Sequence, residues 1–338
     1  MKIAVLFGGR SGEHEVSRNS AASIIANLGD AYEVTAVLIG RDGQWHVDQV
    51  PVRFGQALDV LAEQDVVFPA LHGPYGEDGT VQAMLEWIGV PYVGNGVLAS
   101  AAGMDKAVTK TLLAADGLRV AGGVTLRAGD HLAPADEERL GLPVFVKPAR
   151  AGSSLGVTRV TEWWQLPEAL ALARMFDPGK VLVEPAVIGR EVDVAVLEHA
   201  DGRVEAGPPL EITVTGEGFF DYDAKYAGGA RFQIPALLSP ETTAVLQDRA
   251  IRAFRALGCR GLIRVDFFLP NTEPPTGPGG NEPVLNEVNT FPGFTSASQY
   301  PQIWQRAGID YPQLLDILIA GAVRGTSGSS VVPGAARR

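Results

Sequence analysis

The stretch LIRVDFF, residues 262–268, predicts a buried strand with two charges on one face. Side chains alternate along a strand, so Arg264 and Asp266 point to the same side while apolar neighbours lie between them. The stretch VLNEVN, residues 284–289, repeats the pattern with a carboxylate and an amide two residues apart. Because charges on a buried strand need partners or a metal ion, the two strands mark a chemical site.

These two strands together predict a metal site if they are neighbours in one antiparallel sheet. Asp266, Glu287 and Asn289 would then surround one point. Oxygen ligands of this kind suit Mg²⁺, which takes one or two carboxylates together with phosphate oxygens and water. The alternative is a solvated strand face on which Arg264 and Asp266 form an ordinary ion pair.

A second segment, KPARAGSSLG at residues 147–156, predicts a phosphate-binding loop. Lys147 ends a buried strand, and a loop of small residues follows it. Backbone N–H groups of such a loop can surround a phosphate, and a lysine can reach it as a point charge. The pattern is not a Walker motif, because no helix follows directly. An ordinary hairpin turn is the alternative.

The N-terminal part predicts a doubly wound α/β domain of about 100 residues. An apolar strand at residues 3–7 runs into the loop GGRSGEHEVS, and a helix follows at about 17–28, with Ser17 as its N-cap. His72 lies at the carboxyl end of another parallel strand, where open α/β sheets bind ligands. The alternative is that this lone histidine has a structural role.

The remaining elements predict two α+β domains. The motifs divide the chain into domains at residues 1–103, 104–188 and 189–325, with a frayed tail at 326–338. The glycine-bounded loop at about 215–233 favours an active-site lid over a linker, and a surface Ω-loop is the alternative. The other predicted elements are a helix capped by Asp105 and ending near 115, strands at 123–127, 143–148, 156–160, 181–186 and 191–197, and helices at 165–175 and 240–257.

Composition excludes several functional classes. The net charge of −11 argues against a nucleic-acid or anionic-membrane binder, which needs a basic face. The single cysteine, Cys259, excludes a disulfide framework and a cysteine-built zinc site, and favours the cytosol. The charge-free stretch 87–104 contains proline and several glycines, which predicts a strand, turns and a short helix instead of a membrane span.

The motifs, taken in order, resemble the D-alanine–D-alanine ligase family of the ATP-grasp superfamily. The resemblance covers about residues 1–322 and implies an ATP-grasp fold, in which two α+β domains sandwich ATP. It implies ATP-dependent ligation of two D-alanines through D-alanyl phosphate for peptidoglycan precursors, Mg²⁺ (two ions, with Mn²⁺ as a substitute), a cytoplasmic homodimer, and no nucleic-acid or membrane partner. The matching stretches are GGRSGEHEVS (8–17), LHGPYGEDGT (71–80), MDK (104–106), KPARAGSSLG (147–156), DYDAKY (221–226), RVDFF (264–268) and NEVNTFPGFTSASQYP (286–301).

The resemblance implies a role for each residue that matches a family motif. The metal ligands would be Asp266, Glu287 and Asn289, with Glu287 bridging the two ions. The groups around ATP would be Lys106, Lys147 and Ser154 at the phosphates, and Glu184, Val187 (through its backbone) and Glu191 at the adenine edge and ribose. The catalytic groups would include Glu15, which holds the ammonium of the first D-alanine, and Ser153 and Tyr226, which link Glu15 to the lid. Arg264 and the Gly293 N–H would stabilise the oxyanion. The other substrate contacts would be His72, Lys225, Ser298 and the Gln299 backbone.

Two departures from the family pattern stand beside these roles. Pro185 and Ala186 replace a lysine and a large residue beside the adenine, and Gln299 stands where an apolar residue is common. The alternatives are a non-catalytic ATP-binding protein of the same fold, another ATP-dependent carboxylate–amine ligase, and a nicotinamide dehydrogenase. The dehydrogenase is disfavoured because no GxGxxG follows the first strand.

Overall fold

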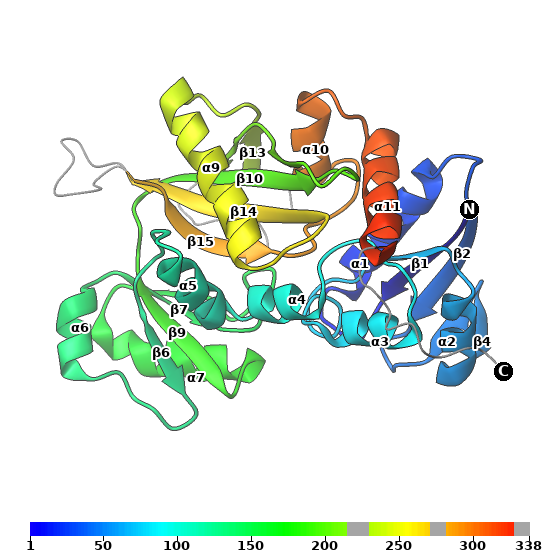
Figure 1. Cartoon of the computed structure of the whole chain (residues 1–338). Coiled ribbons are helices and arrows are strands. Elements are labelled where there is room, and N and C mark those ends of the chain that lie inside the picture. Colours follow the sequence, from blue (N-terminus) through cyan, green and yellow to red (C-terminus); the bar gives the residue numbers. More distant parts are fainter. Residues whose placement is uncertain (215–229, 271–281, 328–338) are drawn as a thin grey trace.

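The computed structural model describes residues 1–214, 230–270 and 282–327. Three sheets, each built from one part of the chain, lie side by side in Figure 1. Each predicted domain therefore holds one sheet. Among the described residues, no helix is both long enough and apolar enough to cross a membrane.

The first part of the chain forms a five-stranded sheet of order β4-β3-β2-β1-β5, flanked by helices. Strand β1 pairs in parallel with β2 and with β5, as a doubly wound domain requires. The hairpin β3–β4 extends the other edge of β2 in antiparallel fashion. The elements are β1 (Lys2–Gly8), α1 (His14–Asn27), β2 (Glu33–Ile39), β3 (Trp45–Val47), β4 (Val50–Val52), α2 (Phe54–Ala62), β5 (Val66–Pro69), α3 (Thr80–Ile88) and α4 (Val97–Met104).

The prediction that Ser17 caps the first helix is wrong. The helix begins three residues earlier, at His14, and Ser17 lies inside it. The Ser17 hydroxyl accepts a hydrogen bond from the Gly8 N–H (2.8 Å) and donates one to the Ala70 carbonyl (2.6 Å). Ser17 is therefore buried and fixes the ends of β1 and β5 to each other.

The central part forms a four-stranded antiparallel sheet of order β6-β9-β7-β8. Asp105 caps its first helix, as predicted, by accepting hydrogen bonds from the N–H groups of Ala107 (3.1 Å) and Val108 (3.2 Å). The elements are α5 (Lys106–Ala115), β6 (Val124–Arg127), α6 (Pro134–Leu140), β7 (Val144–Pro148), β8 (Thr158–Val160), a 3₁₀ turn (Trp163–Gln165), α7 (Leu166–Phe176) and β9 (Lys180–Pro185).

The third part forms a sheet of order β13-β12-β10-β14-β15, with β11 paired to β10. Residues 230–233, expected within the lid loop, form the edge strand β13 instead. The elements are β10 (Gly189–Glu198), β11 (Val204–Ala206), β12 (Leu210–Val214), β13 (Ala230–Gln233), α9 (Pro240–Ala256), β14 (Leu262–Pro270), β15 (Val284–Asn289), α10 (Gln299–Arg306) and α11 (Tyr311–Ser327).

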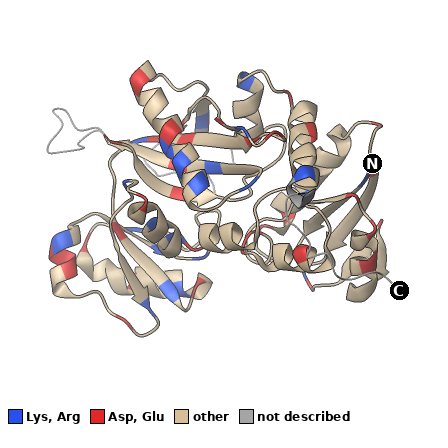
Figure 2. Ribbon diagram, viewed as in Figure 1, with Lys and Arg blue, Asp and Glu red and all other residues tan. Residues whose placement is uncertain are grey.

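Helix α9 covers one face of this third sheet (Figure 1). Its buried side chains, among them Leu246 and Phe254, pack against Val194 and Val265 of the sheet. Charged residues of both signs lie on the face of α9 seen in Figure 2. Helix α9 is therefore amphipathic, with an apolar side on the sheet and a charged side facing outwards. It covers one face of the sheet and leaves the opposite face to other groups.

The first and third parts share one hydrophobic core, whereas the central sheet has its own, and Leu113 of α5 packs in a second cluster with the third part. Phe68 of β5 belongs to the same buried cluster as Trp304 of α10 and Leu315 of α11. Helix α11 contacts both α1 and β5. The central cluster draws its buried members from residues 126–183. The last helix therefore attaches the first part to the third.

Candidate active site

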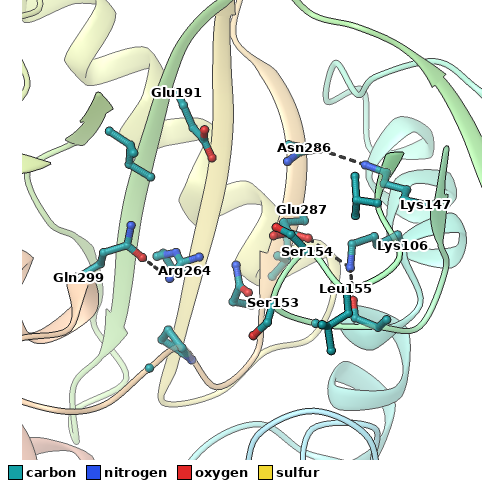
Figure 3. A pocket seen from close by; sticks show the side chains of 18 of the residues that line it. Lys106, Lys147, Ser153, Ser154, Leu155, Glu191, Arg264, Asn286, Glu287 and Gln299 are labelled. Carbon is teal, nitrogen blue, oxygen red and sulfur yellow. Dashed lines mark hydrogen bonds and ion pairs between the residues drawn. The ribbon is translucent and has the colours of Figure 1, made fainter. Parts of the chain in front are cut away.

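A cleft of about 910 Å³ lies where the three parts of the chain meet. Its walls include residues of the α1 start, the β7–β8 loop, the β9–β10 connection and strands β14 and β15. Figure 3 shows Lys106 and Lys147 on one side of this cleft and Arg264 with Gln299 on the other. Every wall thus contributes polar side chains.

Strands β14 and β15 are antiparallel neighbours, as the sequence predicted. Their register places Asp266 opposite Glu287 and Arg264 opposite Asn289. Arg264 Nε and Nη2 donate to the two carboxylate oxygens of Asp266 (2.7 and 2.8 Å). Arg264 Nε is also 3.2 Å from an oxygen of buried Asp193. Burial lowers the pKa of Arg264, but the charge of Asp266 outweighs this effect and raises the pKa above its ordinary value. The guanidinium therefore stays charged.

The predicted metal ligands lie together at this point. Asn289 Nδ2 donates to Asp266 Oδ2 (3.0 Å), and Lys106 Nζ is 3.2 Å from Glu287 Oε2. Two carboxylates and an amide suit Mg²⁺, and the ammonium beside Glu287 shows that a cation is stabilised there. No cluster of three or more His, Cys, Asp or Glu side chains arranged to hold a metal occurs in the described part of the chain.

Lys147 faces both an amide and a carboxylate. Its Nζ donates to Asn286 Oδ1 (3.3 Å) and is 2.7 Å from Glu184 Oε2. Lys110 of α5 donates to the other oxygen of Glu184. Glu184 is buried, and the two ammonium groups overcome the effect of burial and lower the pKa of its carboxyl. Both carboxylate oxygens of the predicted adenine-edge residue are therefore engaged.

The β7–β8 loop lies over the cleft as a phosphate loop would. Ser153 and Ser154 both adopt positive φ (51° and 57°), so the loop turns sharply there. Lys106 Nζ donates to the Ala151 carbonyl (2.9 Å) and holds the loop from below. Ser154 lines the cleft, as do Val187 and Glu191 from the β9–β10 side.

The structure puts Glu15 outside the cleft and Glu13 inside it. The Glu15 side chain is 59% exposed and pairs with Arg18 (3.5 Å) and Arg41 (3.2 Å). Ser153 Oγ instead donates to Glu13, which lines the cleft. The predicted partner of Ser153 must be corrected, because α1 starts at His14 and turns Glu15 to the outer surface.

His72 is buried at the end of β5 and lines the cleft. Its Nε2 is 2.9 Å from Ser20 Oγ, and its Nδ1 is 3.2 Å from the Phe291 carbonyl and 3.4 Å from Glu77 Oε1. Burial alone would lower the pKa of His72, but Glu77 raises it above its ordinary value. Burial in turn raises the pKa of Glu77, a residue that sequence reasoning missed.

Gly293, Ser298 and Gln299 also line the cleft. Thr295 donates its N–H to Ser298 Oγ (3.1 Å), and Arg264 Nη1 donates to Gln299 Oε1 (2.6 Å). The Gln299 amide nitrogen is buried and has no hydrogen-bond partner among the described residues. Gln299 thus contributes its side chain as well as the predicted backbone. Lys225 and Tyr226 lie outside the described residues.

Comparisons with known proteins converge on one family. The model for "D-ala D-ala ligase C-terminus" matches residues 112–320, and that for "D-ala D-ala ligase N-terminus" matches residues 2–60 and 48–95. A D-alanine--D-alanine ligase of Mycolicibacterium smegmatis is 48% identical, over 96% of this chain and 96% of its own.

Solved structures agree with the sequence relatives. The D-alanine--D-alanine ligase of Bacillus anthracis complexed with ATP is similar with a TM-score of 0.81 and 28% identity, covering 98% of this chain and 100% of that one. The VanG D-Ala:D-Ser ligase of Enterococcus faecalis has a TM-score of 0.80 and 36% identity, covering 95% and 99%.

Proposed function

The chain belongs to the D-alanine–D-alanine ligase family, and from this membership we infer that it joins two D-alanine molecules into D-alanyl-D-alanine for peptidoglycan synthesis. The reaction has two steps. A D-alanine carboxylate oxygen attacks the γ-phosphorus of ATP, which releases ADP and gives D-alanyl phosphate. The amine of the second D-alanine then attacks the acyl carbon, loses a proton, and phosphate leaves.

We propose that Lys106, Lys147 and Ser154 hold the phosphates of ATP. Both lysines and the β7–β8 loop line the same cleft, opposite β15. Phosphoryl transfer depends mainly on positioning and charge neutralisation, and an ammonium and loop N–H groups provide both. Val187 and Glu191, on the connection between the two ATP-grasp sheets, would contact the base and ribose.

Asp266, Glu287 and Asn289 would hold Mg²⁺, two ions in all. Their carboxylate and amide oxygens are the ligands this ion prefers, and they lie across one strand pair. When bound, Mg²⁺ neutralises the charge of the triphosphate. Arg264 is also paired with Asp193, and this second carboxylate holds the guanidinium beside Asp266.

Glu13 and His72 would hold the first D-alanine. A carboxylate in the cleft is the natural partner of a substrate ammonium, and Ser153 fixes the orientation of Glu13. His72, whose pKa is raised by the neighbouring Glu77, would face the substrate carboxylate. We propose Glu13 in the role that the family resemblance gave to Glu15.

Arg264 and the Gly293 N–H would stabilise the oxyanion of the second step. Arg264 is buried and held by several partners, so its charge needs no reorganisation when the tetrahedral oxygen develops. Ser298 and Gln299 would hold the carboxylate of the second D-alanine, with Lys225 and Tyr226 closing the site from the lid.

The single observation that carries this proposal is the register of β14 and β15, which joins the oxyanion arginine to the metal-ligand set in the lysine-lined cleft. The test supplies the protein with ATP, Mg²⁺ and D-alanine and measures ADP together with the mass of the product. We expect D-alanyl-D-alanine, and none from L-alanine. ATP binding without turnover would favour a non-catalytic ATP-binding protein, and ADP release only with another amine would favour a different ligase.

We also propose that the protein is a cytoplasmic homodimer. Trp87 and Leu98, on the packed helices α3 and α4, are 92% and 77% exposed. Large exposed apolar side chains are typical of interfaces. Light scattering should give twice the mass of one chain, and Trp87→Glu should give a monomer; a monomeric wild-type protein would contradict the proposal.

A further inference from the structure

A buried cluster of three charges lies behind one wall of the cleft. Lys110 of α5 donates to Glu184 Oε1, and Lys147 of β7 is 2.7 Å from Glu184 Oε2. All three side chains are buried, with Glu184 only 3% exposed. Lys147 and Glu184 line the cleft, whereas Lys110 is not among the lining residues and contacts the site only through them.

If Lys147 binds phosphate, the buried carboxylate of Glu184 loses one of its two cationic partners. In this structure its ammonium is held by Glu184. A phosphate that draws Lys147 away leaves a deeply buried carboxylate, and breaking a buried ion pair is strongly unfavourable when no other partner remains. Lys110 is the second cation on that carboxylate, so Glu184 stays paired when Lys147 turns to the nucleotide.

We propose that Lys110 is a positioning residue that keeps Glu184 paired and thereby frees Lys147 to bind the nucleotide phosphates. This inference rests on the proposed function, since it needs ATP in the cleft. It has a consequence for protons, because the exchange succeeds only when Lys110 carries its charge. Nucleotide binding and protonation of Lys110 should therefore be coupled.

The surroundings of Lys110 make this coupling measurable. Burial and, next, the charge of Lys147 lower the pKa of Lys110 to about 7, against the attraction of Glu184. Among the other charged groups on α5 and the elements packed against it, Lys106, one turn away on α5, pairs with Glu287 of β15, and Arg249 of α9 pairs with Glu282. At the far end of α5, Asp116 pairs with Arg252 of α9.

The sign of the coupling follows from the geometry. When Lys147 leaves Glu184, Lys110 loses a repelling neighbour and becomes the main partner of the carboxylate, so its pKa rises. Above pH 7 the unprotonated Lys110 must then take up a proton as the nucleotide binds. Below pH 7 it is already charged, and little uptake occurs.

The experiment is isothermal titration of the full chain with ATP and Mg²⁺, without D-alanine, in two buffers of different ionisation enthalpy. The difference between buffers gives the number of protons taken up. We expect an uptake that approaches one proton per nucleotide at pH 8 and falls towards zero at pH 6. Lys110→Arg keeps a permanent charge, so it should bind ATP at pH 8 without proton uptake.

Further variants distinguish a role of Lys110 in keeping Glu184 paired from a general contribution to the fold. Lys110→Met should weaken ATP binding at least tenfold at pH 6, and this loss should shrink when Glu184→Gln is added, since the buried charge is then gone. Lys2→Met is the control, because Lys2 is an exposed lysine of β1 and has no part in the cluster. It should leave proton uptake unchanged.

The outcomes distinguish this inference from the proposed function. Tight ATP binding by the wild-type chain with no proton uptake at pH 8 overturns the role of Lys110. The same uptake in Lys110→Arg as in the wild type also overturns it, because the proton then goes elsewhere. If the wild-type chain does not bind ATP at all, the proposed function fails, and this inference fails with it.

Discussion

Two glutamates at the start of α1 differ completely in their surroundings. Glu13 lies in the cleft and accepts a hydrogen bond from Ser153, whereas Glu15 faces the arginines of the outer surface. A charge-assisted contact contributes about 1.5–3 kcal/mol, or roughly a ten- to hundredfold change in affinity. We expect Glu13→Gln to raise KM for the first D-alanine by at least tenfold, measured by ADP release at saturating ATP.

Glu15→Gln is the matched control for this prediction, because it makes the same change two residues away. It should leave KM unchanged, since an exposed ion pair contributes little. If Glu15→Gln raised KM and Glu13→Gln did not, the assignment made from the sequence would hold and the one made from the structure would be wrong.

Gln299 is one of the residues at which this chain departs from the family pattern inside the cleft. Its side-chain oxygen accepts a hydrogen bond from Arg264 at 2.6 Å. Gln299→Met removes this acceptor, so the guanidinium loses one of its fixed partners and is less well positioned for the oxyanion. We expect kcat to fall about tenfold, by the free energy of one hydrogen bond to a charged group.

The matched control for Gln299 is Gln302→Met, three residues later in α10. Within the described part of the chain, the Gln302 side chain bonds only to the Ala297 carbonyl, just before its own helix, and its loss should leave kcat unchanged. Steady-state rates at saturating ATP and D-alanine test both variants. Unchanged kcat in Gln299→Met would mean that Arg264 does not depend on this contact.

At the scale of elements, the β7–β8 loop is positioned by packing at both ends. Arg150 forms two hydrogen bonds with Asp177 (3.0 and 2.8 Å), and Gly156 lies against Phe176, so the loop is tied to the end of α7. In between, a Cβ added at Gly152 would come within 2.7 Å of Glu13 Oε2. The loop and the start of α1 therefore depend on each other.

Gly152→Ala should consequently displace the Glu13 carboxylate and weaken binding of the first D-alanine. We expect a severalfold rise in KM for D-alanine with little loss of stability, because the loop borders the open cleft. Gly122→Ala serves as the control, since nothing lies within 4 Å of a Cβ there. Equal KM values for the two variants would show that the loop yields without moving Glu13.

The elements that the sequence predicted well are those whose pattern is decided locally. The strand at 284–289 is observed at those residues, and its three apolar side chains, Val284, Leu285 and Val288, are the buried ones. The cap at Asp105 was also predictable, because a short acidic side chain before a helical pattern has few alternatives. The polar positions of β14 and β15 likewise located the centre of the site.

The elements that the sequence missed depend on contacts between distant parts of the chain. The hairpin β3–β4 gains its stability from pairing with β2, and β13 from pairing with β12. Ser17 fits a cap pattern, but tertiary hydrogen bonds to Gly8 and Ala70 decide its role. Glu13 and Glu15 could not be distinguished for the same reason, since the choice depends on the residue at which α1 begins.

At the scale of the whole molecule, the distribution of the cores predicts which part moves. The first and third parts share one buried cluster, and Leu113 of α5 packs in a second cluster with the third part. The central sheet keeps a core of its own and meets the third part across the cleft through polar contacts such as Lys147 with Asn286. Polar contacts in an open cleft are more easily exchanged than apolar packing. We infer that the first and third parts unfold as one unit together with α5, and that the central sheet opens separately.

Leu315→Ala tests this division of the molecule. Leu315 is fully buried in the shared core, and its truncation should cost about 2–5 kcal/mol. Hydrogen exchange followed by mass spectrometry should then show faster exchange in β1 and β5 as well as in α11, while β7 and β9 keep their protection. Val146→Ala, at a fully buried position of the central core, should give the reverse pattern. Faster exchange in all three sheets from either variant would mean that the molecule unfolds as one unit.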